Sequence, residues 1–250
     1  MPRFFVKAEQ VNETKIIIIG EDVKHIKNVL RKQIGEKLEI CNQDTGITYI
    51  CEISEINEEK IINNIIKEIS SEEENVKVDI YQGLPKSDKM ELIIQKSVEL
   101  GVNAIIPVEM KRCVVKLDSK SENKKIERWQ KISESAAKQS GRNIVPEIKH
   151  VTTVEKIAEL TKEYDIMIVC YENEKENYLK TELKNLKETL SIKENIKIAV
   201  IIGPEGGLEE KDVNILKQKG AKIVTLGKRI LRTETVALNL LSIIMYELEE

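Results

Sequence analysis

The chain has 250 residues, of which 41% are hydrophobic and 33% charged, which is typical of a globular protein with one large or two modest domains. No apolar run approaches the length of a membrane span, and MPRFFVKAEQ lacks the apolar core of a signal peptide, so we expect a cytoplasmic protein with no membrane partner. The net charge of −3, taken alone, argues against a nucleic-acid partner.

The first 72 residues are predicted to form a β domain. Residues 48–56 alternate apolar and polar side chains with the period of a strand, and residues 60–69 could pair with them. Two further short strands are expected, at residues 3–6 and 15–19.

One helix, from about Asp22 to Gln33, is expected to interrupt these strands and to stop before Gly35. The side chains expected on its inner face are Val23, Ile26, Val29 and Leu30. Polar, acidic residues at 70–75 read as a linker, so we expect a second domain over residues 73–250.

From residue 76 the pattern changes to strands that alternate with helices. Strands are expected at residues 76–81, 104–108, 165–170, 196–202 and 222–226. Helices are expected from Ser87 or Asp88 to Leu100, from Glu122 to Gln139 with Trp129 in the core, between the strands at 165–170 and 196–202, and from Arg232 to Leu248. This alternation predicts a mainly parallel sheet with helices on both faces.

Two glycine-containing turns follow consecutive strands near the end of the chain. The run Ile198–Ile202 stops at the residues GPEGG, and the next strand stops at Gly227. Glycine lets the main chain approach a ligand closely, and ligands collect at the carboxyl ends of parallel strands. A plain strand-to-helix connection is the ordinary explanation of one such turn, but two in succession favour a site. The motif is neither a P-loop nor a dinucleotide fingerprint.

The basic residues are unevenly spread along the chain. Residues 211–232 hold seven Lys or Arg against one acid, whereas residues 1–75 carry more acids than bases. A basic region on an acidic whole is compatible with a local RNA contact, although solvated lysine-rich helix faces explain many of these lysines equally well. The four cysteines form no CxxC pair and only two histidines occur, so we expect buried thiols and no metal site.

GPEGG followed by LGKRILRTET resembles the SPOUT superfamily of RNA methyltransferases, and within it the RsmE-type enzymes, which methylate nitrogen 3 of a uridine in 16S ribosomal RNA of the small subunit. The resemblance spans nearly the whole chain. It implies an α/β SPOUT-type parallel sheet with a C-terminal trefoil knot that binds S-adenosylmethionine, and a PUA-like β-barrel that acts on RNA. It also implies a homodimer in which the broadly apolar last helix packs, although a helix buried within a monomer would explain that composition equally.

The resemblance places the methyl donor at the ends of three strands. The expected cofactor-binding residues are Tyr171, Glu172, Ile202, Gly203, Pro204, Glu205, Gly206, Leu226, Gly227, Lys228, Arg229, Ile230 and Leu231. The expected RNA-binding residues are Arg3, His25, Arg31, Lys86, Arg112, Gln139 and Arg142. Where family members usually have two adjacent histidines, this chain has Lys24 and His25, which weakens an acid–base role there. Arg142 could equally cap the end of its helix.

Methyl transfer needs the donor and the attacking atom held in line with water excluded. Nitrogen 3 of uracil bears a weakly acidic proton, so a fixed cation beside the ring would favour the attacking anion. We expect Arg232 in this catalytic role, with Arg229 second. Glu234, also predicted as catalytic, or Glu205 would accept the proton or orient an arginine, although an Arg232–Glu234 ion pair that caps the last helix is the structural alternative.

Other functions remain open at this point. Within the superfamily, the target could be another RNA or a ribose 2′-hydroxyl. From another class, the chain could be a catalytically silent RNA-binding or assembly protein. No Ser-His-Asp set or metal-ligand pattern favours a hydrolase.

Overall fold

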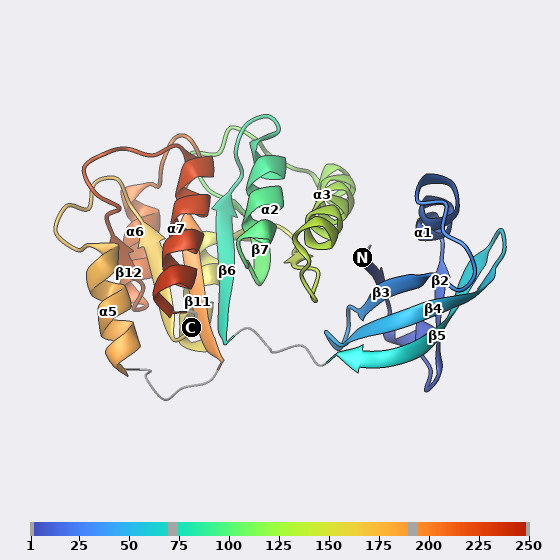
Figure 1. The fold of residues 1–250 in the computed structure, drawn as a ribbon. Coiled ribbons are helices and arrows are strands. Elements are labelled where there is room, and N and C mark those ends of the chain that lie inside the picture. Colours follow the sequence, from blue (N-terminus) through green and yellow to red (C-terminus); the bar gives the residue numbers. More distant parts are fainter. Residues whose placement is uncertain (1–2, 70–74, 190–194, 249–250) are drawn as a thin grey trace. The chain divides into compact units, whose positions relative to one another are not determined.

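The computed structural model describes residues 3–69, 75–189 and 195–248. The chain divides into two units, one of residues 1–73 with 137–145 and one of residues 74–136 with 146–250 (Figure 1). Most of the predicted linker at residues 70–75 lies outside the described residues.

A five-stranded sheet forms the N-terminal unit, in the order β1-β3-β4-β5-β2. Its strands are β1 (Arg3–Val6), β2 (Lys15–Ile19), β3 (Lys37–Asn42), β4 (Thr48–Ile56) and β5 (Lys60–Ile69), with a 3-10 turn, η1 (Ala8–Gln10), after β1. β1 pairs with β3 in parallel and the other neighbours are antiparallel. The four predicted strands are present, and β3 is an additional one that the sequence analysis missed.

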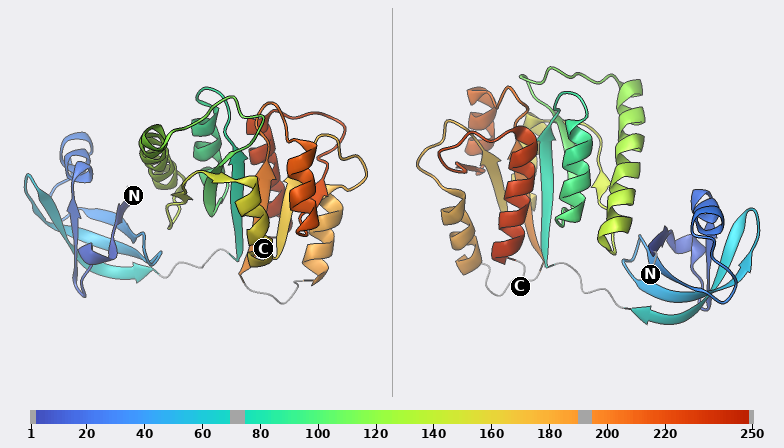
Figure 2. Two further views of the ribbon diagram at one scale, coloured as in Figure 1. Left: turned by 180° about the vertical axis from the view of Figure 1, so that it is seen from behind. Right: turned by 45° about the horizontal axis from the view of Figure 1, so that its top comes forward.

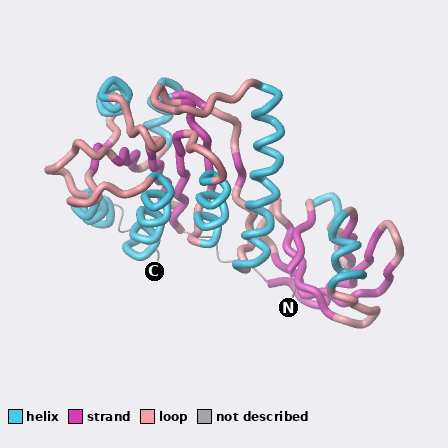
Figure 3. Tube along the Cα trace, turned by 90° about the horizontal axis from the view of Figure 1, so that it is seen from above, coloured by secondary structure: helices cyan, strands magenta, loops and turns pink. Residues whose placement is uncertain are grey.

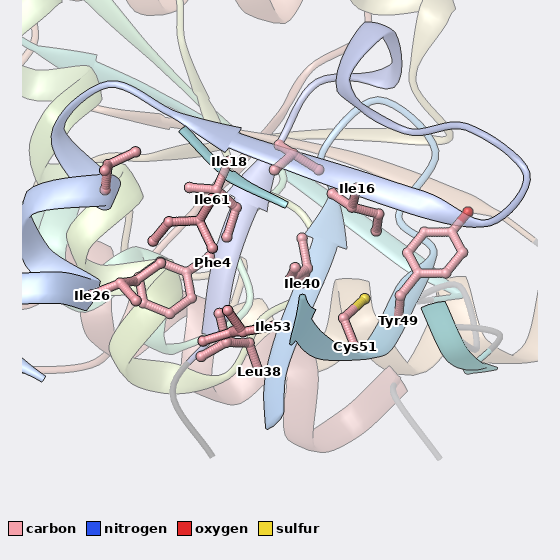
Figure 4. Close-up of a cluster of buried hydrophobic side chains, with 12 residues drawn as sticks. Phe4, Ile16, Ile18, Ile26, Leu38, Ile40, Tyr49, Cys51, Ile53 and Ile61 are labelled. Atoms are coloured by element: carbon pink, nitrogen blue, oxygen red, sulfur yellow. The ribbon is translucent and has the colours of Figure 1, made fainter. Parts of the chain in front are cut away.

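Isoleucine dominates the core of this sheet. Because β-branched side chains suit a pleated surface, one residue type both forms the strands and fills the space between them. The buried cluster comprises Phe4, Val6, Ile16, Ile18, Val23, Ile26, Leu38, Ile40, Tyr49, Cys51, Ile53 and Ile61 (Figure 4).

The helix of the N-terminal unit is shorter than predicted. It consists of α1 (Glu21–Lys24) and a π-helical turn (His25–Val29), in which the Leu30 amide donates to the His25 oxygen at 2.9 Å. Val23 and Ile26 are buried as expected, but Val29 is 70% exposed, so its predicted inner position was wrong. The wider π turn rotates the chain by an extra residue, which carries Val29 away from the core.

The second unit contains a sheet in which all neighbouring strands are parallel, as predicted. Its order is β12-β10-β11-β6-β7-β8, with β9 beside β7. The strands are β6 (Val76–Gly83), β7 (Ala104–Glu109), β8 (Glu147–Ile148), β9 (Thr152–Thr153), β10 (Ile166–Cys170), β11 (Ile196–Ile202) and β12 (Lys222–Val224). β8 and β9 were not predicted, since two residues carry no periodic signal.

Helices cover both faces of this sheet. They are α2 (Lys89–Glu99), α3 (Ser119–Ser140), α4 (Val154–Glu159), the 3-10 turn η3 (Leu160–Glu163), α5 (Leu179–Thr189), α6 (Glu210–Gln218) and α7 (Thr233–Leu248). α2, α5 and α7 lie on one face and α4 and α6 on the other (Figures 1 and 2). Seen from above, the strands form a layer between the two sets of helices (Figure 3).

The helices α2, α3 and α4 differ in how closely they match the sequence prediction. Trp129 of α3 is buried, which confirms its predicted place in the core. Asp88 occupies the residue before α2, but its side chain makes no capping hydrogen bond there. α4 is an additional helix that the sequence analysis did not identify.

The register of the sheet determines where the strand ends meet. Cys170, the last residue of β10, pairs with Ile202 of β11 on one side and with Val224 of β12 on the other. The three strands therefore end at the same level. The turns that follow them share one edge of the sheet, which is the usual location of ligand sites in parallel sheets.

Candidate active site

A cavity of about 530 Å³ opens at the carboxyl ends of β10, β11 and β12. Three segments line it, residues 170–172, 202–207 and 225–233, together with Lys89 and Val236. All of the predicted cofactor-binding residues lie among them, from Tyr171 and Glu172 to Leu231, as do the predicted catalytic residues Arg229 and Arg232. The structure thus brings these residues together in one pocket, and their binding role stays a prediction.

The first turn, residues 203–207, is tightly folded against its surroundings. The Gly207 amide donates to the Pro204 oxygen at 2.9 Å, and Gly207 has a φ of 72°. A Cβ atom at Gly207 would overlap the carboxylate of Glu172. A Cβ atom at Gly83, the last residue of β6, would lie 2.7 Å from the Pro204 Cδ atom. Side chains at either position would therefore push this turn out of place.

A buried hydrogen-bond chain joins the first turn to the start of α7. The Gln82 Nε2 atom donates to the Thr233 hydroxyl at 2.8 Å, and that hydroxyl donates to the Gly203 oxygen at 2.7 Å. Gln82 is fully buried and Thr233 is 6% exposed. Sequence reasoning missed Gln82, although a glutamine inside an apolar strand is the kind of buried polar residue that needs a partner.

Lys89, the first residue of α2, lies between two carboxylates at the pocket. Its Nζ atom is 2.9 Å from Glu205 Oε1 and 3.4 Å from Glu234 Oε2. Burial acts to raise the pKa of Glu205, but the Lys89 ammonium and main-chain donors that include the Lys86 amide outweigh it and hold that pKa below its ordinary value. Sequence reasoning missed Lys89, because the charged first residue of an amphipathic helix gives no signal by itself.

The predicted catalytic residues fall into two environments. Arg229 and Arg232 are exposed and line the pocket. Glu234 is not one of the lining residues, and its carboxylate pairs with Lys89 rather than with Arg232. The pocket therefore presents guanidinium groups to a ligand, while Glu234 supports its wall.

The predicted RNA-binding residues are divided between the units. Arg3, His25, Arg31, Gln139 and Arg142 belong to the N-terminal unit, and Lys86 and Arg112 to the second. Arg3 bonds within its unit, to Glu39, to Asn143 Oδ1 at 2.9 Å and to the Gly141 oxygen. Arg112 Nη1 donates to the Gly206 oxygen at 3.0 Å, so this side chain also steadies the first turn. Contact of these residues with RNA stays a prediction.

Residues 3–69, 75–189 and 195–248 contain neither a membrane-spanning helix nor a metal-ligand cluster. No helix there is both long and apolar enough to span a membrane. No group of three or more His, Cys, Asp or Glu side chains there is arranged to hold a metal ion. The four cysteines are free thiols, three of them buried and Cys170 half-buried at the pocket.

Comparison with known proteins identifies the family. Residues 72–245 match the RNA methyltransferase domain family, and residues 18–65 match the RNA methyltransferase PUA domain family. The ribosomal RNA small subunit methyltransferase E of Bacillus subtilis (strain 168) is 39% identical over 254 residues, covering 100% of this chain and 98% of the relative. This chain belongs to the ribosomal RNA small subunit methyltransferase E family. The resemblance seen in GPEGG and LGKRILRTET is thereby confirmed.

Solved structures of similar proteins agree with this family assignment. A ribosomal RNA small subunit methyltransferase E of Neisseria gonorrhoeae, crystallised with S-adenosyl methionine, is 30% identical and superposes with a TM-score of 0.81, covering 98% of this chain and 97% of that one. A Legionella pneumophila methyltransferase with the bound cofactor is 27% identical with a TM-score of 0.84, at the same coverage. The predicted α/β fold with a parallel sheet and the PUA domain are confirmed by these family matches and structures.

Proposed function

We propose that this chain transfers a methyl group from S-adenosylmethionine to nitrogen 3 of a uridine in the 16S ribosomal RNA of the small subunit. The observation that carries the proposal is the convergence of two glycine-containing turns on one cavity, at residues 203–207 and 226–231. The named activities of its relatives support the same reaction for this chain.

The pocket fits a nucleoside-sized donor in volume and in lining. A cavity of about 530 Å³ lies within the range of roughly 300–1,000 Å³ that is common for small-molecule sites. In its wall the main chain at Gly207 lies close to the Glu172 carboxylate, which is possible because glycine has no side chain. At Gly227, no atom lies within 4 Å of the place that a Cβ atom would occupy. We assign Tyr171, Glu172 and the residues of the two turns to donor binding. S-adenosylmethionine, when bound, supplies a methyl group activated by a sulfonium.

The charged groups of the pocket suit an attack by a uracil anion. In the reaction, nitrogen 3 loses its proton and bonds to the methyl carbon as the carbon–sulfur bond breaks. A guanidinium beside the ring stabilises the anion, and Arg232 and Arg229 both line the pocket. Glu205 is a poor proton acceptor, since the ammonium of Lys89 holds its pKa low. Glu234 pairs with the same ammonium and does not line the pocket. We assign the catalytic role to Arg232, with Arg229 second, and release of the proton to water.

The path of the chain supports a trefoil knot at this site. β12 lies on the far side of β10 from β11, so the chain passes across β10 to reach it. The segment 225–232 then returns, and Thr233 bonds to Gly203 in the turn after β11. We propose that α7 enters through the loop formed by these crossings, as the SPOUT-type resemblance implies.

Two exposed apolar side chains support a homodimer. Tyr246 of α7 is 85% exposed and Ile230 beside the pocket is 87% exposed. Burial of these side chains against a second copy would remove their apolar surface from water, which favours association. We propose that α7 packs against a second copy, that the N-terminal unit contacts the RNA through His25, Arg31, Gln139 and Arg142, and that the enzyme works in the cytoplasm on the small ribosomal subunit.

Calorimetric titration of the full chain with S-adenosylmethionine tests the proposed activity. We expect saturable binding at one site per chain, because one pocket is formed by one chain's own turns. If neither S-adenosylmethionine nor its demethylated product gives a heat of binding, the chain is a catalytically silent RNA-binding protein. Methyl transfer to a ribose hydroxyl would contradict the proposed target atom while leaving the donor site intact.

A further inference from the structure

Lys89 is the one basic pocket residue, among those described, that comes from outside the two turns and the start of α7. It is the first residue of α2, an eleven-residue helix, and its side chain is 31% exposed. A cation at the first turn of a helix faces the positive end of the helix dipole, where an acidic residue is preferred. Because Lys89 departs from this preference and lies at a pocket, we infer that it has a role other than stabilising the helix.

The two partners of Lys89 belong to two different segments at the pocket, the turn after β11 and the start of α7. Glu205 lies in the turn after β11, and Glu234 lies in the first turn of α7, directly after the arginine segment 226–232. Their side chains are 26% and 15% exposed. Without the ammonium, both carboxylates would remain around the same point and repel each other, because partly buried charges are weakly screened. Lys89 therefore sets the spacing between the turn after β11 and the start of α7.

A hydrogen bond also joins these two segments, and its chemistry differs from that of the Lys89 ion pairs. The Thr233 hydroxyl donates to the Gly203 oxygen at 2.7 Å in the interior, where no charge is involved. The ion pair between Lys89 and Glu205 lies at the cavity itself. The hydrogen bond can hold the two segments together, while the ion pairs of Lys89 set the positions of the two carboxylates at the cavity.

We propose that Lys89 is a positioning residue of the methyl-donor pocket, whose ammonium holds Glu205 and Glu234 so that the two turns stay at the distance the donor requires. The inference rests on the proposed function, because the donor is the ligand whose fit is set. Repulsion between the Lys89 charge and the net charge of the donor predicts the opposite sign. S-adenosylmethionine carries a net positive charge, so removing a nearby cation without moving the walls would tighten its binding.

The test compares Lys89→Met with Lys96→Met in the full chain. Lys96 lies on the same helix, is 41% exposed and pairs with Glu99 at 2.8 Å, but it is not a pocket residue, so it is the matched control. Titration calorimetry should show donor binding weakened by about tenfold in Lys89→Met and unchanged in Lys96→Met. In methyl-transfer assays the KM for the donor should rise more than kcat falls. Lys89→Arg, which keeps the cation, should recover most of the affinity.

The outcomes separate this inference from the proposed function. If the unaltered chain does not bind S-adenosylmethionine, the proposed function fails. If it binds, but Lys89→Met binds equally or more tightly, or Lys96→Met loses as much, the role of Lys89 is overturned. If Lys89→Met does not fold, the test uses a variant that combines Lys89→Met with Glu205→Gln and Glu234→Gln. This variant removes the two carboxylate charges that would otherwise lack the ammonium. Donor binding at the level of the unaltered chain in that variant would also overturn the proposal.

Discussion

The hydroxyl of Thr233 donates a hydrogen bond to the main-chain oxygen of Gly203 over 2.7 Å, and so joins the first residue of α7 to the turn after β11. Gln82 donates to the same hydroxyl from the end of β6. A residue of the last helix is thus fixed between two strand ends that are distant in the sequence. The geometry of the pocket depends on this junction.

Thr233→Val should destabilise the protein and weaken donor binding. The substitution keeps the side-chain volume but leaves the partly buried Gly203 oxygen without this donor, which we expect to cost about 1–3 kcal/mol in the free energy of unfolding. Urea denaturation measures that loss, and calorimetry measures donor affinity. Thr233→Ser, which keeps the hydroxyl, should retain most of both. Equal stability of the valine and serine variants would show that the bond is unimportant.

Gly207→Ala should abolish donor binding more completely than its backbone strain explains. Gly207 and Gly20 have φ values of 72° and 75°, but a Cβ atom at Gly207 overlaps the Glu172 carboxylate, whereas nothing lies within 4 Å at Gly20. Gly20→Ala therefore places a Cβ atom on a positive-φ backbone without a clash, and at its φ of 75° and ψ of −140° the strain costs about 1–3 kcal/mol. Donor titration of the two variants separates the effects, and similar affinities would argue that the first turn does not contact the donor.

Arg232→Ala should reduce kcat by about a hundredfold or more, because a pocket cation that stabilises the developing anion acts mainly in the transition state. Donor affinity should change little. Arg128→Ala is the control, since Arg128 is 66% exposed and pairs with Glu91 on α2, away from the cavity lining. Single-turnover methylation measures the rate. An Arg232→Ala protein that methylates at the normal rate would remove the catalytic assignment.

Alkaline pH should destabilise the second unit through two tyrosines, Tyr81, which is buried, and Tyr164, which is half-buried. Tyr164 donates to Asp79 Oδ2 at 2.8 Å, and the Tyr81 and Tyr164 hydroxyls are 2.9 Å apart. Burial raises the pKa of both phenols above their ordinary value of 10.0. Above about pH 10 the unfolded chain therefore loses these protons while the folded chain keeps them, so the free energy of unfolding falls as pH rises.

Tyr81→Phe isolates this effect, because it removes one phenol and leaves the bond between Tyr164 and Asp79 in place. The free energy of unfolding, measured in urea from about pH 8 to about pH 11, should fall less steeply in the variant than in the unaltered chain. Parallel curves for the two proteins would show that Tyr81 does not contribute.

The sequence predicted the parallel sheet and the location of the pocket because both depend on local patterns. The β-branched run that ends at Ile202 and the glycines that follow it mark a buried strand and a close turn without any knowledge of the fold. Since parallel strands end at one edge, the expectation that the residues after β10, β11 and β12 lie together also followed from the pattern.

The parts that could not be predicted depend on tertiary contacts. Lys89 and Gln82 matter through partners far along the chain, Glu205 and Thr233, and nothing in their own neighbourhoods indicates these partners. The π turn after α1 exposes Val29 although its spacing fits a buried helical face. β8 and β9 exist because β7 offers them an edge to pair with, and not because of a strand pattern of their own.

We propose that the protein methylates nitrogen 3 of a uridine in small-subunit ribosomal RNA with a donor held in this pocket. The most direct measurement is to incubate the full chain with isotopically labelled S-adenosylmethionine and unmodified small ribosomal subunits, and then to identify the labelled nucleoside by mass spectrometry. We expect label in N3-methyluridine, and none with the Gly207→Ala protein. Label on a ribose, on another base, or at equal levels with Gly207→Ala would contradict it.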